Sequence, residues 1–245
     1  MSRPGDYVDL HSHWIPDIDD GCRTLDEGIA LLEGLYSIGF STVIATPHMR
    51  PGMFENDRAR LEAAFAAATE QMRDRADLPV VHLASEHYLD DQVFARLLAG
   101  EALPYPTASR LRGVLIELNP QIFPARLANR LVDLKRKGMV TVIAHPERYE
   151  PVWADDRCLD PLFDAGARLL LDVCAVVGKY GRAPQRAAEK LLEDGAYEAA
   201  CSDAHKPQDV PEVERSIRRL EGLVGKEETR RLLSEAPRGI LEGVL

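Results

Sequence analysis

Two histidines near the start of the chain, in the sequence His11-Ser-His13, are the first residues whose type and spacing indicate chemistry. In an extended segment, residues two apart point to the same side, so both imidazoles can bind one ion. Imidazole and carboxylate are ligands that zinc, manganese and iron accept. The same spacing recurs in Asp203-Ala-His205. These pairs predict a metal site.

Other candidate ligands also follow short apolar runs. The chain has seven histidines, and five of them stand at the ends of such runs. If the runs are parallel strands, their carboxyl ends meet at one edge of a sheet or one mouth of a barrel. The candidates at these ends are His11, His13, His48, Glu86, Glu117, His145, Asp203 and His205.

An acidic group, Asp17-Ile-Asp19-Asp20, follows the first run. One of these aspartates is expected to be a further ligand, and the alternative for Asp19 is a helix-capping turn. The spacing of the group does not fit an EF-hand, because positions 6 and 12 of such a loop hold Cys22 and Gly28. With this aspartate there are nine nitrogen and oxygen ligands, which favour two or three ions over one.

Three residues of the same types are expected to lie outside the metal site itself, and the place of a fourth stays open. His82 lies within a predicted strand, and His87 directly follows Glu86 and so points to the opposite face. Both are interpreted as structural. Asp9 is expected to orient a histidine. Asp172 ends the sixth run, where it either faces the site or caps a turn.

The elements that must position these residues alternate between strand-like and helix-like segments, which predicts βαβ units and a parallel sheet. A closed or distorted barrel fits this pattern, and a doubly wound open sheet is the alternative. The predicted strands cover residues 7–10, 42–45, 80–84, 114–118, 140–144, 169–173 and 197–201. The predicted helices cover residues 25–38, 56–74, 125–137, 157–165, 182–193, 210–223 and 226–234.

The composition limits the class of protein. The 245 residues, 45% of them hydrophobic, are enough for a large core, and we expect a single domain over residues 1–245. A net charge of -10 argues against nucleic acid as a partner. No apolar run approaches the length of a membrane span, and the start lacks the apolar core of a signal peptide, so a cytoplasmic protein is expected.

Other hydrolytic mechanisms lack their residues. A thiol phosphatase needs Cys-x5-Arg, and none of the four cysteines has an arginine six positions later. The chain has no Gly-x-Ser-x-Gly motif for a serine nucleophile and no glycine-rich phosphate loop. Hydrolysis of a phosphoester by metal-activated water is therefore the expected reaction.

The order of these motifs resembles the PHP (polymerase and histidinol phosphatase) superfamily over nearly the whole chain. Three segments are similar to the bacterial capsular-polysaccharide tyrosine phosphatases within it. These segments are His13-Trp-Ile-Pro-Asp-Ile-Asp19-Asp20-Gly21, Thr46-Pro-His48-x-Arg50-x-Gly52-Met53-Phe54-Glu55 and Ile143-Ala-His145-Pro-Glu147-Arg148-Tyr149.

The resemblance implies a distorted (βα)7 TIM-like barrel with a trinuclear site of manganese, iron or zinc at the C-terminal ends of the strands. By position, His11, His13, Asp20, His48, Glu86, Glu117, His145, Asp203 and His205 match the metal ligands of the family. Arg148 matches an arginine that holds the substrate phosphate. The expected substrate is phosphotyrosine in a tyrosine kinase that regulates polysaccharide assembly.

One departure concerns the phosphate clamp. These phosphatases usually carry a second arginine after the last histidine, where this chain has Lys206 and no nearby arginine. Lys206 offers a point charge in place of a bidentate guanidinium. Arg50 is a second candidate for a phosphate contact. The alternatives are a PHP phosphoesterase acting on a small phosphomonoester, such as histidinol phosphate or a nucleotide, and a non-catalytic metal-binding regulator of a kinase.

Overall fold

The computed structural model describes residues 5–107 and 109–243, which form an α/β fold with parallel strands. Each of the seven expected runs forms a strand, with ends shifted by a few residues at most. Two short strands, which hold His48 and Glu86, were not expected. The strands are β1 (Tyr7–Ser12), β2 (Phe40–Ala45), β3 (His48–Met49), β4 (Val80–Leu83), β5 (Glu86–Tyr88), β6 (Arg112–Glu117), β7 (Met139–Ala144), β8 (Arg168–Asp172) and β9 (Tyr197–Cys201).

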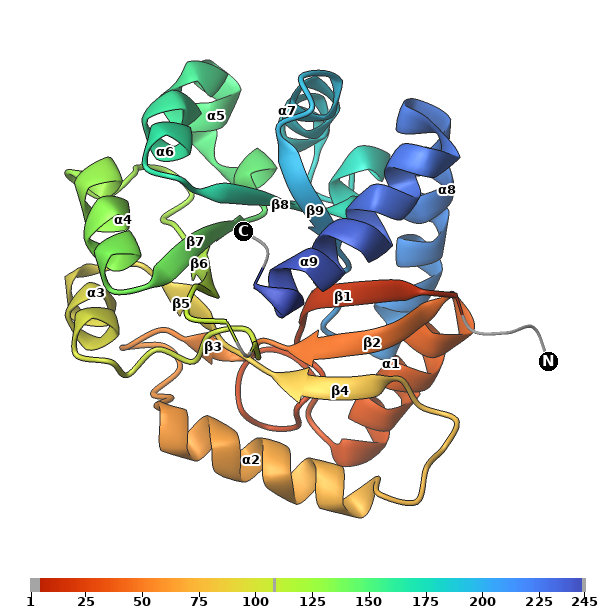
Figure 1. Cartoon of the computed structure of the whole chain (residues 1–245). Helices are drawn as coiled ribbons and strands as arrows, with labels where there is room; N and C mark the ends of the chain where they lie inside the picture. Colours follow the sequence, from red (N-terminus) through yellow and green to blue (C-terminus); the bar gives the residue numbers. More distant parts are fainter. Residues whose placement is uncertain (1–4, 108, 244–245) are drawn as a thin grey trace.

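Strand pairing arranges these segments in two parallel sheets, ordered β1-β2-β4 and β3-β5-β6-β7-β8-β9 (Figure 1). The sheets meet at two places. At one, β3 follows β2 and β5 follows β4, and the Glu86 amide donates to Pro47 O at 3.2 Å. At the other, an isolated parallel bridge joins Ser12, the last residue of β1, to Ala204, which lies beyond the end of β9. The pairing of the described residues defines two sheets and does not establish a closed barrel.

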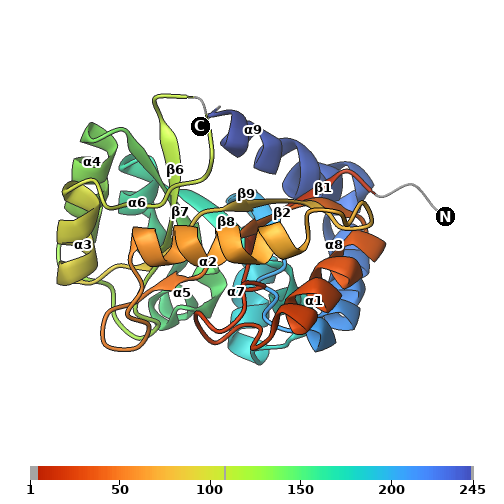
Figure 2. The same cartoon turned by 90° about the horizontal axis from the view of Figure 1, so that it is seen from below.

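Helices lie outside the strands, and α2 crosses in front of them in the view from below (Figure 2). The α-helices are α1 (Leu25–Ser37), α2 (Arg58–Gln71), α3 (Asp91–Leu98), α4 (Leu127–Arg136), α5 (Glu150–Ala154), α6 (Asp160–Asp164), α7 (Arg182–Glu193), α8 (Val210–Arg230) and α9 (Ala236–Glu242). The 3-10 turns are Pro146–Arg148, Asp156–Leu159, Val173–Val177 and Pro207–Asp209, and Arg231–Glu235 is a π-helical turn.

Several helices begin at the capping residues that the sequence supplies. Thr24 accepts a hydrogen bond from the Glu27 amide at the start of α1, and Asp57 accepts one from the Arg60 amide at the start of α2. Helix α3 was not predicted, because its eight residues are too short for a clear periodicity.

The break predicted between the last two helices is present. Helix α8 spans both segments, but Gly225 within it has a φ of 82° and a ψ of 167°, a non-helical conformation that divides the helix there. A π-helical turn then leads into α9, which was not expected. Among residues 5–107 and 109–243, no helix has both the length and the apolar character that a bilayer span requires.

The buried apolar side chains form two clusters. The larger cluster lies between the helices and the strands and includes Leu31 of α1 and Leu131 of α4. The smaller cluster draws on most of the longer strands, with Tyr105 and Ile240 of α9 added. Its strand residues are Val8, Leu10, Ile44, Leu115, Val142, Ala144, Leu170, Ala199 and Cys201. Strands of both sheets therefore contribute to one apolar cluster, and the residues at their carboxyl ends are polar.

Candidate metal centre

The two histidines that opened the sequence lie at the end of β1, where its pairing with β2 is irregular. Val8 and Leu10 belong to the interior cluster, so strict alternation would point His11 to the opposite side. The register of β1 against β2 shifts between Asp9 and Ser12. Such irregularities re-aim side chains. Both imidazoles are buried and point into a common centre with other candidate ligands.

Four ligand atoms from three segments come together in this centre. Nε2 of His11 lies 3.2 Å from Nε2 of His13 and 2.8 Å from Oδ1 of Asp203. The same Asp203 oxygen lies 3.4 Å from Nε2 of His13. Oε2 of Glu86 lies 3.4 Å from His11 and 3.6 Å from His13. Ligands about 2.1 Å from a tetrahedral ion stand about 3.4 Å apart. These five contacts, from 2.8 to 3.6 Å, therefore have the spacing of ligands on transition-metal ions.

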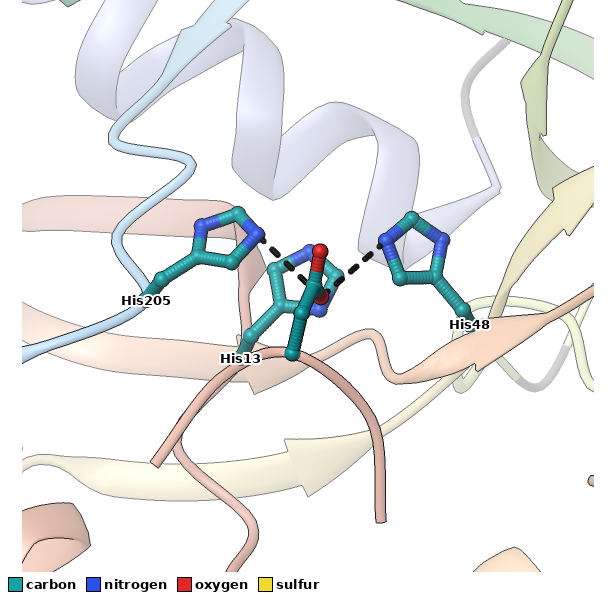
Figure 3. Close-up of side chains that lie close together, drawn as sticks. His13, His48 and His205 are labelled. Atoms are coloured by element: carbon teal, nitrogen blue, oxygen red, sulfur yellow. Dashed lines mark ion pairs between the residues drawn. The ribbon is translucent and has the colours of Figure 1, made fainter. Parts of the chain in front are cut away.

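A second group of ligand atoms shares His13 with the first. Figure 3 shows His13, His48 and His205 converging from three different segments. Oδ1 of Asp20 lies 3.5 Å from Nε2 of His48 and 3.6 Å from Nε2 of His205. The rings of His13 and His205 are stacked, with centroids 4.1 Å apart. These four side chains can hold an ion next to the first group.

Glu86 connects the remaining candidates. Its Oε2 lies 2.9 Å from Nδ1 of His48, and its Oε1 lies 3.0 Å from Nε2 of His145. Oε2 of Glu117 lies 3.8 Å from the same nitrogen of His48. The structure thus brings all nine candidate ligands into overlapping groups, and Glu86 takes part in two of them.

Two carboxylate oxygens in this centre indicate that a cation fits. Oδ1 of Asp203 and Oε2 of Glu117 are buried and form no hydrogen bond of acceptable geometry with any described residue. An unsatisfied buried acceptor costs about 1–3 kcal/mol. A metal ion would satisfy both atoms, so the donor set suits the ions that histidine and carboxylate bind.

Two of the candidate ligands have unusual backbone conformations. His145 has a φ of 35° and Asp203 a φ of 46°, both in the left-handed region that residues other than glycine rarely adopt. Each directly follows a strand or lies just beyond it. Such strain concentrates at functional sites, where the surrounding structure holds the residue in place. Here it lets both side chains turn into the centre.

Charge interactions within the centre shift several pKa values. Burial opposes a charge on His11, yet the carboxylates of Glu86 and Asp203 raise its pKa to about 10. Burial also opposes the charge on Asp203, but Arg148 and His11 hold its pKa well below the usual range. Burial and the nearby Glu86 raise the pKa of Glu117 to about 7. Since an imidazole binds metal only without its proton, metal binding here releases protons.

Two aspartates support the centre without joining the ligand groups. Asp19 accepts hydrogen bonds from Nδ1 of His13 at 2.8 Å and from the amide of His48 at 3.1 Å. It therefore orients ligands, while its neighbour Asp20 faces the centre. Asp9, which is expected to orient a histidine, binds His11 through the backbone. It accepts from the His11 amide and from the amide and hydroxyl of Ser202, so it joins β1 to the residue after β9.

Arg148 lies at the edge of the centre, at the end of a 3-10 turn. Its Nη2 donates to Oδ2 of Asp172 at 2.7 Å and also forms an ion pair with Asp203. Its guanidinium carbon lies 4.1 Å from the centre of the Tyr180 ring. Its Nε is buried and has no hydrogen-bond partner among the described residues. This donor is available to an anion beside the ligand groups.

Arg50 approaches the centre from the loop after β3. Its Nη1 lies 3.9 Å from Oε2 of Glu117, and its guanidinium carbon lies 4.0 Å from the centre of the Tyr88 ring. Lys206 is exposed, and its backbone is fixed by Asp209, whose side chain accepts from the Lys206 amide and whose amide donates to the Lys206 carbonyl. Arg50 is thus the second guanidinium at the centre of a chain that lacks the arginine expected after His205.

The two remaining histidines lie outside the ligand groups, as expected. His87 is buried, its Nδ1 donates to Leu115 O at 2.9 Å, and its Nε2 accepts from the Leu103 amide at 3.2 Å. His82 is partly exposed on β4.

The structure decides the role of Asp172 that the sequence left open, and it gives Glu147 a role that the sequence did not predict. Asp172 both caps the turn after β8, through the Cys174 amide, and binds Arg148. Glu147 is fully buried next to Arg148. Its place in the sequence Ala-His145-Pro-Glu147-Arg148 was noted, but no local signal separated its role from those of its neighbours.

Comparison with known proteins agrees with this geometry. The family described as capsular polysaccharide synthesis, CpsB/CapC, matches residues 7–242. The tyrosine-protein phosphatase CpsB of Streptococcus pneumoniae is 26% identical over 96% of this chain and 98% of its own length. The tyrosine-protein phosphatase YwqE of Bacillus subtilis (strain 168) is 27% identical over 81% of this chain and 77% of its own.

Solved structures give the same relationship. A crystal structure from work on YwqE of Bacillus subtilis and CpsB of Streptococcus pneumoniae, described as metal-dependent tyrosine phosphatases, superposes with a TM-score of 0.86 at 25% identity. It covers 96% of this chain and 94% of its own. An amidohydrolase from Mycoplasma synoviae, at 13% identity and a TM-score of 0.58, shares the fold alone. The resemblance noted in the sequence is therefore confirmed, and the chain belongs to the CpsB/CapC family of capsular polysaccharide synthesis.

Proposed function

We propose that this protein is a metal-dependent tyrosine phosphatase that hydrolyses phosphotyrosine in a protein substrate. The observation that carries the proposal is the convergence of His11, His13, Glu86 and Asp203 at the spacing of metal ligands. Arg148 adjoins this group through Asp203 and has a buried donor without a partner in the described chain. The relatives named tyrosine-protein phosphatases support phosphotyrosine as the substrate.

The cofactor in this proposal is a set of two or three ions of manganese, iron or zinc. The ligand set supports more than one ion, because the nine residues form four groups and the Glu86 carboxylate, which belongs to two of them, could bridge two ions. When bound, such ions lower the pKa of coordinated water and neutralise charge on phosphoryl oxygens. The residues proposed to hold them are His11, His13, Asp20, His48, Glu86, Glu117, His145, Asp203 and His205.

The arginines bind and orient the phosphate in this mechanism. Arg148 presents a planar guanidinium, which binds two phosphate oxygens at once in a way that lysine cannot. Asp172 and the Tyr180 ring limit its orientations. Arg50 supplies the second positive charge, held by the Tyr88 ring. The leaving group is a phenolate, whose pKa of about 10 allows departure without a dedicated acid.

The proposal includes a finer description of the architecture. We interpret the two sheets as a single distorted (βα)7 barrel in one domain spanning residues 1–245. The support is the smaller apolar cluster, which gathers side chains from β1, β2, β6, β7, β8 and β9 around one interior. The contacts between the sheets at Ser12 and Glu86 support the same interpretation.

The proposed partner is a bacterial tyrosine kinase that controls polysaccharide synthesis, and the family description supports the link to polysaccharide synthesis. The cytoplasmic location expected from the sequence belongs to the same proposal. The reaction can be tested without knowing the partner or the location, because a phosphotyrosine peptide can serve as the substrate.

The test combines elemental analysis of the purified protein with a substrate panel. We expect bound transition metal, and a kcat/KM for phosphotyrosine peptides well above the values for phosphoserine peptides, histidinol phosphate and nucleotides. The His11→Ala variant, purified in parallel, controls for contaminating phosphatases. A preference for a small phosphomonoester would overturn the proposed substrate, and metal binding without any turnover would indicate a regulator instead of an enzyme.

A further inference from the structure

Glu147 is a buried acid that the proposed mechanism does not use. Its side chain is 0% exposed. Its Oε1 accepts a hydrogen bond from the Asp172 amide at 3.0 Å, and its Oε2 accepts one from the Tyr197 hydroxyl at 2.9 Å. Burying a carboxyl group is costly unless its oxygens are satisfied. Each oxygen here has a specific donor, so the group is held in one orientation.

The two donors come from opposite ends of neighbouring strands. Tyr197 is the first residue of β9, and Asp172 is the last residue of β8. Glu147 itself lies in the 3-10 turn Pro146–Arg148, which follows β7. The Glu147 side chain therefore connects β8 and β9 to the turn that follows β7. The same turn carries Arg148.

The link to Asp172 continues to the phosphate-binding arginine. The Asp172 amide is bound by Glu147, and the Asp172 side chain binds Nη2 of Arg148 at 2.7 Å. The other Asp172 oxygen accepts from the Cys174 amide at 2.8 Å. With both its amide and its side chain fixed, Asp172 cannot turn away from the guanidinium. The hydrogen bonds thus run from Tyr197 through Glu147 and Asp172 to Arg148.

We propose that Glu147 is a positioning residue for Arg148, which acts by fixing Asp172 at the end of β8. The inference rests on the proposed role of Arg148 as the phosphate contact. A general contribution to the fold would weaken activity whatever residue stands at position 148. Positioning predicts something different, because the benefit of Glu147 disappears when there is no guanidinium to orient.

The test is a double-mutant cycle between Glu147→Ala and Arg148→Ala, read with p-nitrophenyl phosphate and with inhibition by inorganic phosphate. In the wild-type background, we expect Glu147→Ala to lower kcat/KM and weaken phosphate inhibition, each by roughly tenfold, as is usual for residues that orient a functional group. In the Arg148→Ala background, we expect less than about a twofold change. Metal content should be equal in all four proteins.

Two further variants check the chemistry of the link. Glu147→Gln should retain most activity, because an amide oxygen still accepts from the Asp172 amide and its nitrogen can donate to the Tyr197 oxygen. Glu150→Ala is the matched control, since that carboxylate is exposed close to the same turn, and it should leave kcat/KM unchanged. If Glu147→Ala does not fold, Asp172→Asn takes its place in the double-mutant cycle. It should give the same result, because Asp172 lies between Glu147 and Arg148 in the hydrogen-bonded path.

Equal losses from Glu147→Ala in both backgrounds would overturn the inference, and so would full activity in a folded Glu147→Ala protein. If the loss of kcat/KM from Asp172→Asn simply adds to that from Arg148→Ala, the inference would also be overturned. Arg148→Ala with an unchanged kcat/KM would remove the role of Arg148 and this inference with it. A wild-type enzyme that prefers another phosphomonoester would instead contradict the proposed substrate alone, and the cycle would still decide the role of Glu147.

Discussion

Nε2 of His11 lies 2.8 Å from Oδ1 of Asp203, and this contact joins the first strand of the chain to the turn after the last. The two residues are also tied through the backbone, since the Asp203 amide donates to His11 O at 3.0 Å. The metal centre therefore forms only when β1 is packed against the segment that follows β9. Loss of either side chain should affect the metal before it affects the fold.

Replacement of a shared ligand should cost more than replacement of a peripheral one. His11 belongs to two ligand groups and His205 to one. We expect His11→Ala to release more metal than His205→Ala, and both to lower turnover of p-nitrophenyl phosphate by at least about a thousandfold, since bound ions supply several kcal/mol. Elemental analysis and steady-state kinetics measure both effects. His82→Gln is the control, and near-normal turnover by either alanine variant would contradict the metal-centre proposal.

Removal of the metal should abolish activity and lower stability together. A ligand present at a thousand times its Kd stabilises the folded state by about 4 kcal/mol. Exhaustive chelation should therefore reduce turnover to background and lower the Tm, and readdition of manganese, iron or zinc should restore both. Comparison of the three ions would identify the one that supports catalysis. Turnover that survives complete chelation would exclude a metal-dependent reaction.

Arg148→Ala should impair catalysis while the metal is retained. The guanidinium lies at the edge of the centre, and in the proposed mechanism its loss removes the charge that binds the phosphoryl oxygens. We expect kcat/KM to fall by about a hundredfold to a thousandfold. Arg148→Lys should recover only part of this, because an ammonium lacks the planar pair of donors. Elemental analysis shows whether the metal is kept, and an unchanged kcat/KM would remove the assigned role.

Arg50→Ala should have a smaller effect that is independent of Arg148. Arg50 lies near Glu117, whereas Arg148 contacts Asp203, so they approach through different ligands. We expect kcat/KM to fall by about tenfold, and the losses in the double variant to add. This contrasts with the cycle expected for Glu147. Kinetics of the single and double variants decide the point, and a normal Arg50→Ala enzyme would make this arginine an ordinary loop residue.

The acid sensitivity of the fold should depend on His87. Burial lowers the pKa of His87 from 6.5 to about 4. A group with a lowered basic pKa in the folded state stabilises the fold above its unfolded pKa, and this contribution is lost as the pH falls from 6.5 through 4. The lost contribution is about 3 kcal/mol. His87→Gln keeps a donor and an acceptor without this titration, so its unfolding free energy should fall less over the same range.

Urea unfolding of chelator-treated wild type and His87→Gln, at several pH values between 4 and 7, measures this difference. Chelator in both samples prevents metal release from contributing to the slope. Parallel curves for the two proteins would show that His87 does not titrate between the folded and unfolded states.

The amino-acid sequence by itself determined the strands and the residues at their ends. Apolar runs buried on both faces are a local pattern, and so are the pairs His11-Ser-His13 and Asp203-Ala-His205. The convergence of these ends follows from parallel topology, in which carboxyl ends meet. For this reason eight candidate ligands could be named before their distances were known, and the family resemblance added Asp20.

Only the tertiary structure decided which neighbouring carboxylates face the metal centre and which support it. Asp20 faces the centre, whereas Asp19 accepts hydrogen bonds from His13 and His48. It also makes Glu147 the link between Asp172 and Tyr197. These assignments depend on which distant donor lies within about 3 Å of a carboxylate. Local spacing cannot specify such distances, because they are set by the packing of strands that are far apart in the sequence.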